Sequence, residues 1–215
     1  LVETLHGSAR NDPAATMRFL ERTDSELDLL SQMVEELLEL SRIESRQVPV
    51  KPVPTPVPEL VIPPVERLRP QAQRGDLLVV TTLRQGLPPV MADASRIHQV
   101  VTNLVHNAIK FTPPGGSIEI TACRGKPEGE DDASTVVISV ADTGVGIPKE
   151  AKARIFERFY KADQARASAG TGLGLAIVKH LVHAHGGRVW ATARKPAGST
   201  FSFSLPVALP AGRTR

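Results

Sequence analysis

Polar side chains recur at helical spacing between residues 93 and 111, where the sequence predicts a helix. At 100° per residue they form one narrow stripe, made of Gln99, Asn103, His106, Asn107 and Lys110. Asparagine is a weak helix former, so helix propensity does not account for two of them one turn apart. An amide oxygen suits a hard cation such as Mg²⁺, and a lysine one turn further suits a phosphate. A solvated helix face is the alternative for this stripe taken alone.

A second chemical group follows the apolar run Val136–Ala141. Here Asp142-Thr143-Gly144-Val145-Gly146-Ile147 places a carboxylate at the end of an expected strand, ahead of two spaced glycines. Such a carboxylate can accept a hydrogen bond from an exocyclic amine such as that of adenine, and the glycines let a flat base approach the backbone. A simple turn is the alternative explanation.

The third group is Gly170-Thr171-Gly172-Leu173-Gly174-Leu175, which runs into another expected helix. Glycines just before a helix leave unpaired N–H groups that can hold phosphate, and the helix dipole helps them. The spacing fits neither a P-loop nor the dinucleotide fingerprint. The polar stretch 161–169 before it is rich in alanine and serine, and we expect it to act as a mobile lid.

The elements that must position these groups follow from periodicity and from glycine and proline positions. The sequence predicts helices at 57–74, 93–111, 148–160 and 172–185, and strands at 77–83, 117–124, 134–141, 188–194 and 199–205. The apolar side of the second helix is made of Ile97, Val100, Val101, Leu104, Val105 and Ala108. Because several strands follow one another without a crossover, we expect an α+β fold. Its mixed, largely antiparallel sheet is covered by helices on one face.

The N-terminal segment differs in composition. From Asp12-Pro13, an N-cap followed by proline, to about Ser45 the chain lacks glycine and proline. Its leucines and valines recur at spacings of three, four and seven, which implies a bundle partner. With a preceding helix that turns at His6-Gly7-Ser8, this segment forms a predicted helical hairpin, and two copies make a dimeric four-helix bundle. Prolines then crowd residues 46–64 and mark a boundary; an edge strand and a proline-rich ligand are both compatible with them.

Composition excludes several classes of function. The chain has 215 residues, 41% hydrophobic and 23% charged, with a net charge of +3. It lacks a basic block with interleaved aromatics, so nucleic-acid binding is not expected. The single cysteine, Cys123, excludes an internal disulfide and a cysteine-based zinc site. No apolar run is long enough to span a bilayer, so we expect no membrane contact by these residues. His183 and His185 are expected at the surface of a helix end.

In their order, these motifs resemble those of the sensor histidine kinases, whose catalytic domain belongs to the ATPase superfamily of gyrase B, Hsp90 and MutL. Residues 103–113 resemble the N box, 142–147 the G1 box, 156–160 the F box and 170–175 the G2 box. Gly198-Ser199-Thr200-Phe201 is similar to the closing strand motif, and residues 37–44 to the end of the dimerisation helix. The resemblance covers nearly the whole chain.

The resemblance implies a role for each motif in binding ATP with Mg²⁺. Asn107 is the expected metal ligand, with Asn103 near the same site. Asn107, Lys110 and Lys161 are the expected catalytic residues, the two lysines facing the phosphates, while Asp142 accepts a hydrogen bond from the adenine amine. The remaining expected nucleotide-binding residues are Phe111, Gly144, Gly146, Ile147, Tyr160, Gly170, Thr171, Gly172, Leu173, Gly174, Leu175 and Thr200. Thr200 is expected behind the adenine pocket.

The resemblance also implies an organisation and an activity. Residues 1–46 form the dimerisation hairpin, 47–58 a linker with an edge strand, 59–207 the catalytic domain and 208–215 a tail. The expected activity transfers the γ-phosphate of ATP to a histidine, for relay to the receiver domain of a response regulator. The expected location is the cytoplasm, with the parent protein attached to the membrane.

Two positions depart from the family pattern. The phosphoacceptor histidine and its following Leu-Arg-Thr-Pro stretch are not found, and Leu1–Leu5 resembles what comes after them. We therefore expect the acceptor upstream of Leu1, a chain that binds ATP without phosphorylating itself, and no such role for His6. Ala169 stands where the family often has glycine. Two alternatives are a nucleotide-driven clamp of the gyrase or MutL kind and a dimerising scaffold without turnover.

Overall fold

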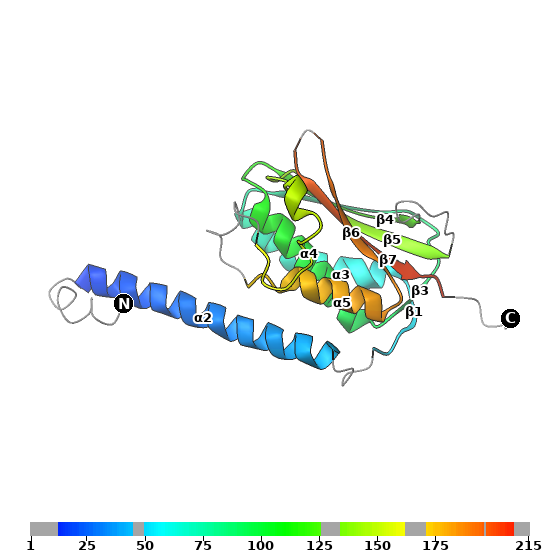
Figure 1. The fold of residues 1–215 in the computed structure, drawn as a ribbon. Coiled ribbons are helices and arrows are strands. Elements are labelled where there is room, and N and C mark those ends of the chain that lie inside the picture. Colours follow the sequence, from blue (N-terminus) through cyan, green and yellow to red (C-terminus); the bar gives the residue numbers. More distant parts are fainter. Residues whose placement is uncertain (1–12, 45–49, 126–133, 162–170, 196, 209–215) are drawn as a thin grey trace.

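The computed structural model describes residues 13–44, 50–125, 134–161, 171–195 and 197–208. A five-stranded sheet carries three helices on one face, and the long helix α2 (Pro13–Glu44) runs along the outside of this helical layer (Figure 1). The proposed first helix of the hairpin and its turn lie outside the described residues. No helix in the described ranges combines the length and the apolar character that crossing a membrane requires.

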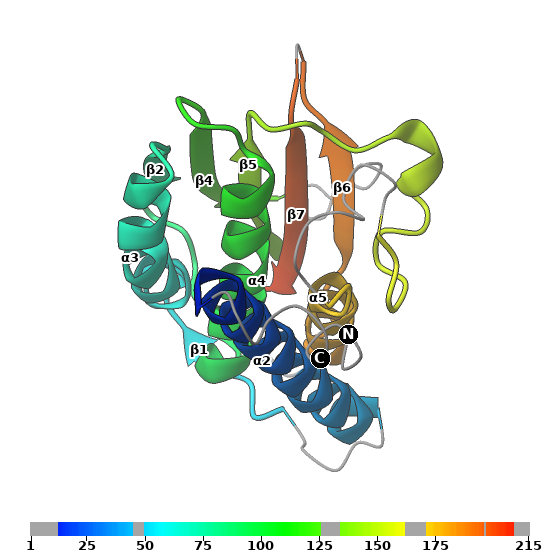
Figure 2. The same ribbon diagram turned by 90° about the vertical axis from the view of Figure 1, so that its left-hand side faces the viewer.

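The sheet has the order β2-β4-β5-β7-β6. Its strands are β2 (Leu78–Leu83), β4 (Ser117–Arg124), β5 (Thr135–Asp142), β7 (Ser199–Pro206) and β6 (Val189–Ala193). β2 and β4 pair in parallel and every other pair is antiparallel, which confirms the predicted mixed sheet. Figure 2 shows the helices α3, α4 and α5 in front of it.

The central helix α4 (Ala94–Phe111) follows its sequence pattern closely. The Asp93 carboxylate caps it by accepting the Arg96 N–H at 3.4 Å. Its buried residues are the six predicted ones: Ile97, Val100, Val101, Leu104, Val105 and Ala108. The helix therefore turns its polar stripe away from the core.

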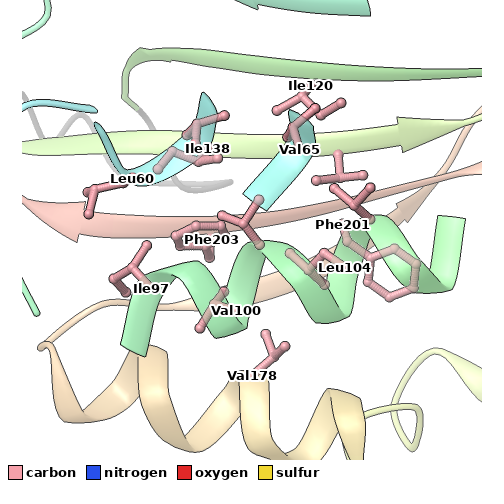
Figure 3. Packing of buried hydrophobic residues seen from close by; sticks show 14 of the residues in the cluster. Leu60, Val65, Ile97, Val100, Leu104, Ile120, Ile138, Val178, Phe201 and Phe203 are labelled. Carbon is pink, nitrogen blue, oxygen red and sulfur yellow. The ribbon is translucent and has the colours of Figure 1, made fainter. Parts of the chain in front are cut away.

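The core lies between α4 and the sheet. Figure 3 shows Leu104 of α4 beside Phe201 of β7, and Val100 on the side of the helix that faces Val178 of α5. The helices α3 (Val57–Arg74) and α5 (Gly174–Ala184) pack beside α4. α3 contains three internal prolines. It persists because its apolar face is buried in the same core, and burial outweighs the lost backbone bonds.

The proline-rich segment contributes a short strand, one of the two alternatives left open by the sequence. β1 (Val53–Thr55) pairs antiparallel with β3 (Val90–Ala92), which the sequence analysis does not predict. The Lys51 N–H also donates to the Asp93 carboxylate at 3.2 Å. The segment that leaves α2 is therefore fastened to the N-terminus of α4.

Two local predictions are wrong. Of the helical pieces expected at 148–160, the structure has only the 3₁₀ helix η2 (Lys149–Ala151), followed by turns. The Phe159 N–H donates to the carbonyl of Gly172 at 3.0 Å instead of continuing a helix, and Phe159 adopts a φ of 58°. His185 is 6% exposed rather than at the surface. Its two ring nitrogens contact the Leu181 carbonyl (2.7 Å) and the Asp93 N–H (3.0 Å).

Candidate functional site

The carboxylate of Asp142, at the end of β5, is 3% exposed. Its Oδ1 accepts the N–H groups of Gly144 (2.8 Å) and Ser199 (3.2 Å), and its Oδ2 accepts the Ser199 hydroxyl (2.5 Å). All three donors are neutral. A carboxylate offers about four acceptor positions, so one position is left for a donor on a bound molecule.

Glycines allow three segments to meet at this carboxylate. A Cβ on Gly144 would lie 2.3 Å from the backbone oxygen of Phe111, and a Cβ on Gly198 would lie 2.0 Å from that of Asp142. Gly198 also has a φ of 107°, and Gly146 one of 75°. The end of α4, the loop after β5 and the β6–β7 hairpin therefore close on Asp142 because these positions carry no side chain.

The strand β7 contributes Ser199 to the contacts of Asp142, while the expected role of Thr200 stays a prediction. Side chains alternate along a strand, and Ser199 shares its face with the buried Phe201 and Phe203, which pack against the helices. Thr200 is therefore on the opposite face of the sheet. The apolar residues at alternate positions of β7 were a signal from which Ser199 could have been chosen.

The polar stripe of α4 approaches the glycine-rich loop. The Asn103 side-chain amide donates to the carbonyl of Gly174 at 3.3 Å. Asn107, one turn further, is half-buried, and within the described part of the chain its amide has no hydrogen-bond partner. Its oxygen is thus available to a cation. His106, on the same stripe, is exposed.

Positive charge gathers at the end of α4. Burial of the Lys110 side chain, and then the nearby charge of Lys161, lower the pKa of Lys110 below its ordinary value. The Lys110 Nζ lies 5.0 Å from the ring centroid of Phe111. A second lysine close enough to lower this pKa concentrates positive charge, which favours an anion such as a polyphosphate.

The glycine-rich loop is shaped by backbone contacts. Gly172 has a φ of 76°, and a Cβ there would lie 3.0 Å from the backbone of Phe159. Leu173 is fully buried, so its expected contact with the nucleotide is restricted to backbone groups, whereas Leu175 is only partly buried against the core. Gly170 and residues 162–169 of the proposed lid lie outside the described residues.

An open cleft of about 360 Å³ lies beside Lys161. It is lined by Arg154, Glu157, Arg158, Phe159, Tyr160 and Lys161. The guanidinium of Arg154 stacks 4.7 Å from the Tyr160 ring centroid and pairs with Glu157 at 3.0 Å. The Tyr160 ring is thereby held at the edge of the site.

These contacts bring together groups that are distant in the sequence. Gly144 joins Asp142 to the end of α4, Lys161 approaches Lys110, and Asn103 holds the loop before α5. The buried carboxylate of Asp142 lies at one end of the site. The two lysines and the amide of Asn107, which has no hydrogen-bond partner among the described residues, lie at the other end. This donor set fits a nucleotide with a divalent cation. Sequence reasoning missed Ser199 and also Glu36 of α2, which bonds to Thr171.

Comparison with known proteins adds an independent finding. Residues 92–209 match the family described as histidine kinase-, DNA gyrase B- and HSP90-like ATPase. The sensor-like histidine kinase SenX3 of Mycolicibacterium smegmatis is 36% identical over 208 residues, which cover 96% of this chain and 52% of SenX3.

Two solved structures share the fold over most of the chain. Full-length ShkA in complex with AMPPNP superposes with a TM-score of 0.72 at 30% identity, covering 91% of this chain and 39% of ShkA. Histidine kinase ThkA in complex with the response regulator protein TrrA gives 0.72 at 29% identity, covering 92% and 53%. The chain spans about half the length of the curated relatives it matches.

Proposed function

The chain belongs to the family of histidine kinase-, DNA gyrase B- and HSP90-like ATPases, and on that premise we propose that it is the ATP- and Mg²⁺-binding catalytic part of a sensor histidine kinase. Proteins named as histidine kinases are among those it resembles, including SenX3 and ThkA. The activity of the whole protein, its metal and its partners are part of this proposal.

The observation that carries the proposal is the environment of Asp142. Burying a carboxylate is costly unless it is well hydrogen-bonded, and here three neutral donors hold it while one acceptor position stays open. An exocyclic amine of adenine is the matching donor. The close backbone at Gly144 and Gly146, with Ile147 beside them, supplies a flat surface for the base.

The phosphate end is assigned to the lysines and the loop before α5. Lys110 and Lys161 would neutralise phosphate charge, and the backbone from Thr171 to Gly174 would face the phosphate oxygens. Asn107 would hold Mg²⁺, with Asn103 nearby, and the bound ion would supply further neutralisation of charge. Phosphoryl transfer needs chiefly positioning and electrostatic stabilisation, which this set of residues supports.

The partners are proposed from α2 and from the relatives. Several large apolar side chains described in α2 are 47–60% exposed: Met17, Leu20, Leu27, Leu30, Val34, Leu37 and Leu38. A helix with this many exposed apolar side chains needs another helix, so we assign it to a homodimer. The ThkA structure contains a response regulator, which supports a receiver domain as the second partner. The cytoplasm, where ATP is available, is the proposed location.

The nucleotide site is tested by calorimetric titration with ATP and Mg²⁺. We expect binding that weakens at least about tenfold in Asp142→Asn, because the amide turns one acceptor into a donor facing the adenine amine. The control is Asp76→Asn, an exposed position whose φ of 54° asparagine tolerates. Equal affinities of wild type and Asp142→Asn would contradict the assignment.

Transfer to histidine is tested separately, in the longest chain that the gene encodes. With γ-labelled ATP we expect protein-bound phosphate that is labile in acid and stable in alkali, and its loss in Asn107→Ala. Acid-stable label would indicate a different acceptor. Release of free phosphate alone would favour the nucleotide-driven clamp.

A further inference from the structure

A carboxylate from α2 reaches the glycine-rich loop. The hydroxyl of Thr171 donates a hydrogen bond to the Oε2 of Glu36, which is 135 residues away in the sequence. Thr171 is 6% exposed, and its hydroxyl oxygen also accepts the Leu173 N–H at 3.2 Å. This hydroxyl therefore links α2 to the loop that leads into α5, and Figure 2 shows α2 passing beside α5.

The place where Glu36 arrives is the proposed phosphate end of the site. α5 begins at Gly174, and Leu173 before it provides no side-chain cap, so the first backbone N–H groups of the helix have no intrahelical partner. Asn103 fastens the carbonyl of Gly174 to the polar stripe of α4. A negative charge on Glu36 thus stands at the loop that would receive the negative phosphates.

We propose that Glu36 is an autoinhibitory residue: its carboxylate, held at the glycine loop by Thr171, makes the docking of α2 on α5 and the binding of ATP oppose each other. This inference rests on the proposed function, since it concerns the phosphates of ATP. Docked α2 weakens ATP binding through charge repulsion. By thermodynamic linkage, bound ATP weakens the docking of α2 by the same factor. A movement of α2 then changes the nucleotide affinity of the domain.

The size of the effect follows from Coulomb's law. Two unit charges about 8 Å apart at an effective dielectric constant of about 40 change an equilibrium constant about fivefold. ATP bound with Mg²⁺ carries more than one negative charge, while solvent and salt screen the interaction. We therefore expect a change of about five- to tenfold, which becomes smaller at high ionic strength.

The test compares the affinities of wild type, Glu36→Gln and Glu35→Gln for ATP with Mg²⁺. Glutamine at position 36 keeps an acceptor for the Thr171 hydroxyl and removes the charge of the carboxylate. Glu35 is the exposed neighbour on the same helix, so Glu35→Gln is a matched control for net charge. Glu36→Gln should bind ATP about five- to tenfold more tightly, while Glu35→Gln should change the affinity less than about twofold.

Adenosine is the second ligand, because it lacks phosphates. Its affinity should be the same in all three proteins. An unchanged ATP affinity in Glu36→Gln overturns the inference, and so does an equal gain for ATP and adenosine, which would indicate a steric effect of the helix. Adenosine binding without any ATP binding, or no binding of either ligand, would instead count against the proposed function and remove the inference with it.

Hydrogen exchange measures the reverse effect, which is the weakening of α2 docking by bound ATP. ATP should increase exchange in residues 30–40 of α2 in the wild-type chain, because it weakens the contact of Glu36 with Thr171. The increase should be smaller in Glu36→Gln. Protection of this segment by ATP would show that nucleotide and α2 docking support each other, which contradicts the proposal.

Discussion

Replacing Gly198 by alanine should damage both the stability of the domain and its affinity for ATP. The new Cβ would lie 2.0 Å from the backbone oxygen of Asp142, and the residue has a φ of 107°. Relieving the contact means moving the start of β7 away from the end of β5. The two hydrogen bonds from Ser199 to the Asp142 carboxylate would then lengthen or break.

The expected loss of folding free energy is the sum of two contributions, the strained φ at position 198 and the weakened hydrogen bonds to Asp142. A non-glycine residue at this φ costs about 1–3 kcal/mol, and weakened bonds to a buried carboxylate add about 2–3 kcal/mol. For a chain of this size each kcal/mol lowers Tm by roughly 2–4 °C, so the Tm of Gly198→Ala should fall by about 6–24 °C. Because Asp142 is displaced, the affinity for ATP should fall at least about tenfold.

Alanine substitutions at two other glycines separate the effect of a backbone clash or a strained φ from the effect on the nucleotide site. Gly187→Ala brings a Cβ to 1.9 Å from the backbone oxygen of Ser204, a similar clash at the other end of the sheet. It should lower Tm and leave ATP affinity within about twofold. Gly86 has a φ of 71° with nothing within 4 Å of a Cβ, so Gly86→Ala should cost only about 1–2 kcal/mol.

The assay is thermal unfolding of the ligand-free proteins, followed by calorimetric titration with ATP at a temperature where every variant is folded. Of the three variants, we expect only Gly198→Ala to lose both thermal stability and affinity for ATP. If Gly198→Ala kept wild-type ATP affinity while losing as much Tm as Gly187→Ala, the link between the β6–β7 hairpin and the nucleotide site would be refuted.

Four further predictions concern separate parts of the molecule. Because the folded pKa of Lys110 is lowered, the unfolded chain binds more protons between that pKa and the ordinary one. Ligand-free stability should therefore rise with pH across this window, and denaturant unfolding of Lys110→Met should show no such rise. Asn107→Ala should weaken ATP binding in Mg²⁺ by about tenfold or more but have little effect in EDTA, as measured by calorimetry; equal losses in both would argue against a metal ligand. His185→Ala should lower stability by about 2–4 kcal/mol in denaturant titrations, since two buried hydrogen bonds and packing are lost, and an unchanged midpoint would contradict this. Leu30→Lys on α2 should shift the chain from dimer to monomer in sedimentation, whereas a monomeric wild type would refute the dimer assignment.

The sequence predicted best where one periodic pattern governs a whole element. In α4 the spacing of apolar residues was sufficient to give all six buried positions, and the polar stripe followed from the same period. In β7 the resemblance pointed to Thr200, whereas the alternation of Phe201 and Phe203 already places Ser199 on the buried face.

Other features depend on contacts that no local pattern carries. The segment 148–160 has helical composition, yet the bond between Phe159 and Gly172 bends it to meet the glycine loop. The three-residue strand β3 exists because β1 pairs with it. The contact of Glu36 with Thr171 joins residues on separate elements and could be found only from the fold.

The central claim is that Asp142 reads the base of a bound adenine nucleotide, and a structure of the chain with AMPPNP and Mg²⁺ tests it most directly. We expect the exocyclic amine within about 3 Å of the Asp142 Oδ2, at the acceptor position that Ser199 leaves open. We also expect phosphates beside Lys110 and the cation on the Asn107 amide oxygen. A base bound away from Asp142, or phosphates turned away from the lysines, would contradict the account.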